Sequence, residues 1–184
     1  MSTTLHRPPM RTSDEATEKQ LEMAAQQGET YKAALTHMAE EVADVGATKR
    51  VGDYVVAFAA ENAEGMYEMH DGELTWHAPD EENVHIEITA CDGADGRFVP
   101  GLQVFVTLTD DAGNKIGRHQ QPFLWHPWLY HYGRNWKIPG DGTYTVDVEI
   151  KAPDFPRHDH KNGDRFAHDV RVKFENVQLK TGQK

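Results

Sequence analysis

The sequence predicts a mainly β protein, an immunoglobulin-like antiparallel β-sandwich preceded by one helix. Three observations support this prediction: short runs with a two-residue apolar period follow residue 50, turn-forming residues separate these runs, and no helical period long enough for parallel crossovers lies between them. A length of 184 residues suits one domain with an appendage and is enough to bury a sizeable core.

The helix is predicted over residues 13–46, after a polar segment of residues 1–12 that we expect to be flexible. Its apolar stripe has spacings of three and four residues and consists of Tyr31, Leu35, Met38, Val42 and Val45. Thr12 with Glu15 is typical of a capping box, and Gly46 occurs where a helix would end. The stripe indicates packing, either on the main domain or, as an arm, on a second subunit.

Five strands are predicted within a β domain that extends from about residue 50 to residue 180. The runs are YVVAFAA, VHIEITA, LQVFVTL, TYTVDVEI and VRVKFENVQL. The segments DDAGN at 110–114 and PGDG at 139–142 supply turns between them. An antiparallel arrangement of about seven strands is the expected result.

Charge and cysteine content exclude several classes of function. The formal net charge of −11 disfavours nucleic acid and anionic lipid as partners and favours cations. Cys91 is the single cysteine, so no internal disulfide is expected. No apolar run is long enough for a membrane span and no secretory signal is recognisable, so a cytoplasmic location is expected for the chain as written.

Histidine content points to a metal site. Nine of the eleven histidines fall in the β-rich part. A single histidine in a strand is usually structural. Neutral imidazole is also the commonest protein ligand for borderline metal ions. His85 and Glu87, two apart on a strand, project from the same face. Met66 lies beside His70 in EGMYEMH, a segment expected to be a loop, where a methionine could bind a soft ion or simply fill a gap.

The order of motifs resembles the iron-transport family of periplasmic proteins that accompany high-affinity ferrous-iron permeases. The motifs are YVVAFAAENAEGMYEM, VHIEI, VPGLQVFVTLTDDAGNKIGRHQQPF, HYGRN and GDGTYTVDVEIKAPDFPRH, between about residues 50 and 178. The resemblance implies an immunoglobulin-like sandwich, a homodimer, copper binding, a role in iron uptake with a permease partner, and a periplasmic location as the alternative to a cytoplasmic one.

The resemblance also implies a ligand set. It comprises His85 and Glu87 of the His-x-Glu motif, His131 of HYGRN and His158 of the late Arg-His segment. Where the family has a Met-Pro-Met segment this chain reads QQPFL, with Phe123 near the expected thioether position. We expect His126, His119 or Met66 to replace it, or a harder site that suits copper(II), iron, zinc or manganese. A divalent ion there should bind more weakly below a pH of about 6.5, the ordinary pKa of imidazole.

Two alternatives remain open from the sequence. The same ion could serve a redox or hydrolytic enzyme, because an incomplete ligand shell leaves a position for water or oxygen. The chain could instead be a non-metal binding module whose tryptophans form the binding surface.

The HYGRN motif also has two interpretations. Tyr132 and Gly133 suggest a turn that aims His131 inward, with Asn135 fixing the loop; alternatively the motif is a structural corner.

Overall fold

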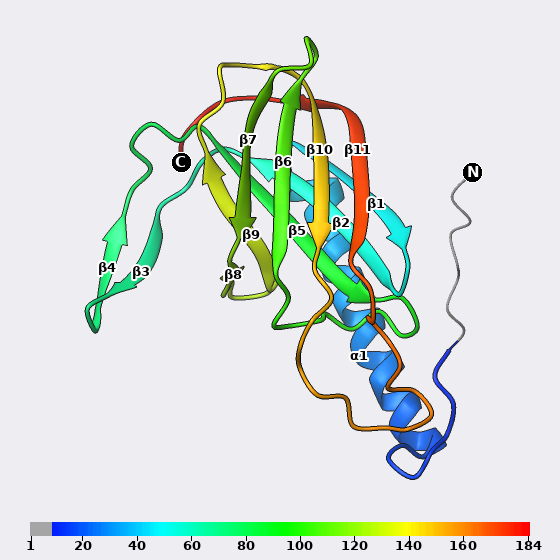
Figure 1. The fold of residues 1–184 in the computed structure, drawn as a ribbon. Helices are drawn as coiled ribbons and strands as arrows, with labels where there is room; N and C mark the ends of the chain where they lie inside the picture. Colours follow the sequence, from blue (N-terminus) through cyan, green and yellow to red (C-terminus); the bar gives the residue numbers. More distant parts are fainter. Residues whose placement is uncertain (1–8) are drawn as a thin grey trace.

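Two antiparallel sheets pack face to face in the computed structural model, which describes residues 9–184 (Figure 1). The first sheet has the strand order β1 (Val45–Val51), β2 (Tyr54–Glu61), β5 (Val84–Asp92), β9 (His131–Trp136) and β8 (Phe123–Leu124). The second has the order β11 (Val170–Leu179), β10 (Gly142–Ile150), β6 (Val104–Asp110) and β7 (Lys115–Gln121). Strands β3 (Met66–His70) and β4 (Glu73–His77) form a separate hairpin that projects from the sandwich. The mainly β antiparallel fold with an N-terminal helix is confirmed.

The core lies between the two sheets. Alternate residues of the central strands point into it, and Val56, Ile86, Val106 and Val148 are completely buried. Each such side chain contributes about 1.5–3 kcal/mol through removal of apolar surface from water. The alternation leaves the other face of the first sheet, which carries His85 and Glu87, outside the sandwich core.

The helix is shorter than predicted. Helix α1 (Glu18–His37) continues into one π-helical turn, η1 (Met38–Val42), and the chain then becomes extended at Ala43. Its capping box uses Thr17 and Gln20 in place of Thr12 and Glu15, because Thr17 accepts from the Gln20 backbone and Gln20 accepts from the Thr17 backbone. Gly46 does not end the helix, because it pairs with Ala59 in the β1–β2 ladder.

Helix α1 covers the outer face of the first sheet (Figure 1). Tyr31, Leu35 and Met38 pack with Ala59 of the sheet and with Leu129. A Cβ at Gly28 would lie 1.7 Å from the Asp95 carbonyl oxygen, so only glycine permits this close approach of the helix. Most of the predicted stripe therefore packs on its own sandwich, while Val42 remains exposed and Val45 lies in β1.

Several strands were not recognisable from apolar periodicity. The segment predicted as a loop around Met66 forms strand β3, and HYGRN forms strand β9 where a turn was predicted. Strands β1 and β7 lie at sheet edges and carry many polar residues, so their runs lack a clear apolar alternation. No helix within residues 9–184 is long and apolar enough to cross a membrane.

Candidate metal centre

The pairing of β5 with β9 builds the centre on the outer face of the first sheet. In this antiparallel ladder Glu87 lies opposite Gly133, and His85 lies opposite Asn135. Because side chains alternate along a strand, His131, Gly133 and Asn135 share the face that carries His85 and Glu87. Strand geometry, rather than a turn, therefore aims the His131 ring at the VHIEI motif.

Three potential ligands converge at this position. One nitrogen or oxygen atom from each of His85, Glu87 and His131 lies within 4.8 Å of the other two. The Glu87 Oε1 atom is 3.5 Å from His131 Nε2 and 3.8 Å from His85 Nε2. All three residues are buried, so they form a compact group of two imidazoles and one carboxyl group away from bulk water.

Both histidines are held by the ring nitrogen that faces away from this group. His85 Nδ1 lies 2.9 Å from Asn135 Oδ1, and His131 Nδ1 lies 3.0 Å from the Leu129 carbonyl oxygen. The amide of Asn135 is itself fixed, because its nitrogen donates to the Glu64 carbonyl oxygen and its oxygen accepts from the Glu64 backbone. Each ring thus donates from Nδ1 and presents an Nε2 lone pair. Both Nε2 atoms are buried and have no hydrogen-bond partner, which is the arrangement that a metal-binding imidazole requires.

Gly133 keeps space open between the two rings. A Cβ on this residue would lie 2.9 Å from His85 Nε2 and 3.0 Å from His131 Cδ2, closer than such atoms normally approach. Tyr132, on the opposite face, is buried in the core, where its hydroxyl donates to the Val99 carbonyl and accepts from the Leu102 backbone. On one face of strand β9, HYGRN therefore supplies the His131 ligand, the space at Gly133 and the Asn135 amide that positions His85. On the other face it supplies Tyr132 to the core.

A cavity of about 90 Å³ adjoins the group. The other polar or polarisable side chains that line it are Met38, Glu61, Glu64, His126, Trp128 and Lys184. Lys184 pairs with Glu61, and Nδ1 of His126 is buried without a partner. Met38 supplies a thioether from the π-helical turn, a kind of helix irregularity that is frequent at functional sites.

The structure brings only part of the predicted ligand set together. His126 lies near His131, with ring centroids 6.0 Å apart, and lines the cavity. Met66 lies in the hairpin beside a different groove, and His119 packs its ring against Trp136. The His158 side chain is 91% exposed and pairs with Glu15, because it belongs to the long loop between β10 and β11.

The tryptophans do not form one surface. Trp136 is buried in the core, Trp128 lines the cavity, Trp125 is exposed, and Trp76 lies in the hairpin. Of the aromatic side chains Phe123, Trp125, Trp128, Tyr130 and Trp136, only Trp128 lines the cavity.

Burial sets the protonation states of the group. It lowers the pKa values of His85 and His131 to about 4, although the hydrogen bonds of their Nδ1 atoms with Asn135 and Leu129 act to raise these pKa values. Burial, together with the nearby carboxylates of Glu61 and Glu64, raises the pKa of Glu87 to about 8. At neutral pH the three metal-free side chains are therefore mostly uncharged, and binding a cation would displace a proton from Glu87.

These pKa shifts predict that the contribution of His85, Glu87 and His131 to the stability of the metal-free protein is greatest near pH 6.5. Above that pH the folded state keeps the Glu87 proton that the unfolded chain has lost, so the free energy of unfolding should fall by about 2 kcal/mol up to pH 8. Below pH 6.5 the unfolded chain binds two more protons at His85 and His131, so stability should fall again. Urea unfolding at a series of pH values, in the presence of a chelator, measures the fall in the free energy of unfolding above pH 6.5 (the alkaline limb) and below it (the acidic limb).

The Glu87→Gln variant is the control for this prediction. Glutamine does not titrate, so the contribution of this residue to the alkaline limb should disappear while the acidic limb persists. An identical loss of stability between pH 6.5 and 8 in the parent and the variant would contradict the assignment of the high pKa to Glu87.

Comparison with known families decides the identity of the chain. The family model described as Fe²⁺ transport protein matches residues 38–179, more than three quarters of the sequence. The chain belongs to the iron-transport family. The match begins in η1, after helix α1. It includes the three potential ligands and every residue that lines the adjoining cavity except Lys184. No curated protein matches this family member.

Solved structures share the fold of this chain. FetP of uropathogenic Escherichia coli strain F11, recombinantly expressed in the periplasm, has 21% identity and a TM-score of 0.60, covering 74% of this chain and 94% of its own. Copper-reconstituted P19 of Campylobacter jejuni has 19% identity and a TM-score of 0.62, covering 76% and 96%. A copper-bound variant of the same FetP has 22% identity and a TM-score of 0.57, covering 73% and 92%.

Proposed function

We propose that this protein binds a copper ion between His85, Glu87 and His131 and acts in the uptake of ferrous iron. The observation that carries the proposal is the pair of buried Nε2 atoms without partners, aimed at one carboxyl group. A buried imidazole nitrogen normally has a hydrogen-bond partner, so two bare ones at one position indicate a missing ligand. The bound copper would supply a redox-active or Lewis-acid centre, with ferrous iron as the transported ion.

The donor set supports copper over zinc and iron as the resident ion. Two imidazoles and a carboxylate bind first-row divalent ions, and affinity for such ligands peaks at copper(II). The Met38 thioether in the cavity wall adds a soft donor that suits copper(I). Copper is also the ion named for the C. jejuni P19 and E. coli FetP structures of the same fold.

The residues around the group would position it rather than react. Asn135 and the Leu129 carbonyl hold the two rings in the tautomer that exposes Nε2. Helix α1 and η1 restrict access from solvent, since Met38 packs over the sheet beside Glu87. Glu61 and Glu64 would attract a cation, and Lys184 partly neutralises them.

The cellular setting is proposed from the family. A periplasmic location, a ferrous-iron permease partner and a homodimer follow from the resemblance, and the recombinant expression of the related FetP in the periplasm is consistent with the first of these. The expected cytoplasmic location gains no support from the family or its neighbours. The net charge of −11 suits a protein that captures cations.

Metal titration of tag-free protein tests the proposal. With copper(II), iron(II) and zinc(II) competed against chelators of known affinity, we expect one tightly held copper per chain and weaker binding of zinc and iron at the same position. The tightly held copper should be lost in His85→Ala. If the parent binds no copper at micromolar concentration, or binds it equally well in that variant, the proposal is wrong.

A further inference from the structure

The β3–β4 hairpin carries a second group of potential metal ligands away from the buried centre. Its two-residue turn, Asp71-Gly72, has positive φ at both positions, +49° and +86°, as the tight turn of a β-hairpin requires. The turn fixes the register, in which Met66 lies opposite His77 and His70 lies opposite Glu73. Asp-Gly is a strong hairpin signal, so this element was recognisable from sequence by its turn, although not by apolar periodicity.

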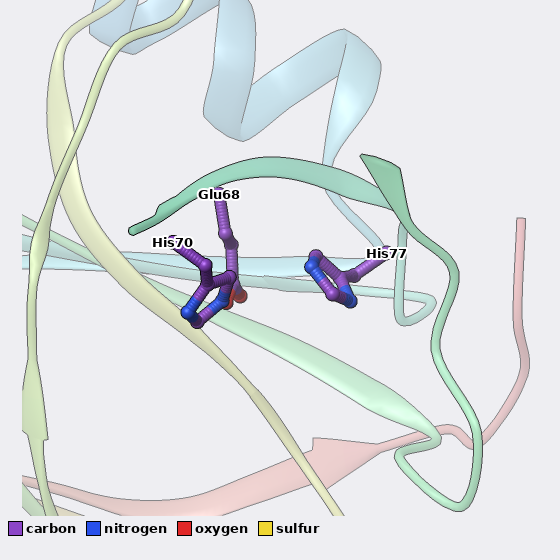
Figure 2. A group of neighbouring side chains, drawn as sticks. All are labelled: Glu68, His70 and His77. Atoms are coloured by element: carbon purple, nitrogen blue, oxygen red, sulfur yellow. The ribbon is translucent and has the colours of Figure 1, made fainter. Parts of the chain in front are cut away.

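The register sorts the hairpin side chains onto two faces. Residues directly opposite one another share a face, so Glu68 and His70 of β3 lie on the face that carries His77 of β4. The other face is formed by exposed apolar side chains, namely Tyr67, Met69, Leu74 and Trp76. Figure 2 shows the three ligand-type side chains projecting from the same side of the hairpin and converging.

The separations suit a single ion. The nearest ligand atoms of Glu68, His70 and His77 all lie within 4.8 Å of one another. His70 Nε2 is 3.1 Å from Glu68 Oε2, and the two imidazole rings are 5.2 Å apart between centroids. Two ligands bound at about 2.1 Å lie at most about 4.2 Å apart, so binding requires only a small rotation of side chains. All three side chains are exposed, and such a rotation meets little resistance.

We propose that Glu68, His70 and His77 form a second, solvent-accessible site for a divalent transition-metal ion of the copper and zinc type. Two imidazoles and one carboxylate make a donor set for such ions, and three protein ligands leave positions open for water. Glu68 and His77 also line an open groove of about 500 Å³ that is bounded on its other side by Gly133, Arg134 and Asn135. An ion held there is accessible from solvent and exchanges readily, unlike one bound at the buried centre.

Binding at this site would also link the two strands of the hairpin. A two-stranded hairpin without further packing is marginally stable in water. Ligands from β3 and β4 on one ion would cross-link them and reduce opening of the hairpin, since an ion that binds only the closed form stabilises it. Slower amide hydrogen exchange in residues 66–77 on metal binding is therefore a signature that a chance surface contact would not produce.

The test is copper(II) titration of the tag-free full chain with a competing chelator, monitored by electron paramagnetic resonance and hydrogen-exchange mass spectrometry. We expect two ions per chain with distinct spectra, the more weakly bound one showing two imidazole nitrogens. In His70→Ala/His77→Ala the weaker ion should be lost and the protection of residues 66–77 should no longer increase. The matched control, His158→Ala/His160→Ala, removes two exposed loop histidines and should retain both ions.

The outcomes separate this proposal from that for the buried centre. His131→Ala should lose the tighter ion and keep the hairpin ion, whereas the hairpin double variant should show the reverse. A parent that binds one ion per chain overturns the hairpin site, as does a double variant with two ions at unchanged affinity. Loss of the weaker ion in the loop-histidine control would also overturn it. Each result leaves the test of the buried centre intact.

Discussion

Copper affinity is expected to fall by more than about a hundredfold when His131 is replaced with alanine. Losing a group that merely hydrogen-bonds to a metal ligand already weakens binding by about 10–100-fold, and His131 would contribute a bond to the ion itself. Its Nε2 atom is buried, has no partner and lies 3.5 Å from Glu87 Oε1. Competition titration against a chelator, with far-ultraviolet circular dichroism as a check on folding, measures the loss.

Two further variants define what the loss means. Asn135→Ala removes the acceptor of His85 Nδ1 without removing a ligand, so it should weaken copper by about 10–100-fold, less than His131→Ala. His160→Ala, in an exposed loop, should bind as the parent does. Copper affinity that is unchanged in a folded His131→Ala protein would show that the ion, if any, binds elsewhere.

Copper affinity is expected to rise roughly fiftyfold between pH 6 and pH 8 and to level off above pH 8. The competing proton is on Glu87, whose pKa burial raises to about 8, so the metal-free protein binds this proton more fully as pH falls. The imidazoles do not compete in this range, because burial lowers their pKa values to about 4. The weakening below about pH 6.5 expected from ordinary imidazole is thus replaced by a carboxyl-controlled dependence at higher pH.

Chelator competition at half-unit intervals of pH gives this profile, and proton release on binding gives an independent measure. About one proton per copper should appear at pH 6.5 in the parent and close to none in Glu87→Gln, which should bind copper weakly with little dependence on pH. A profile flat from pH 6 to 8, breaking only near pH 4, would mean that Glu87 is already ionised in the metal-free protein.

Part of the centre could be predicted from local sequence. A two-residue spacing is enough to place His85 and Glu87 on one face of a strand, because strand side chains alternate wherever the strand lies. The same rule applies to His131 and Asn135, but a turn was expected in HYGRN, and strand alternation was not considered there. In the structure Gly133 leaves space beside the His85 ring and does not bend the chain. The five apolar runs likewise specify β2, β5, β6, β10 and β11 through their own periodicity.

Local periodicity and motif order are enough to specify the sandwich of two antiparallel sheets, the family and the strand face that carries His85 and Glu87. Which distant residues join them, including His131 of strand β9, depends on how the chain packs in three dimensions. Met38 and His126 reach the cavity because the helix end and the segment before β9 cross the same sheet face, whereas His158 is carried away by a long loop. Burial, which gives Glu87 its high pKa, likewise arises only when helix α1, η1 and the sheet pack together.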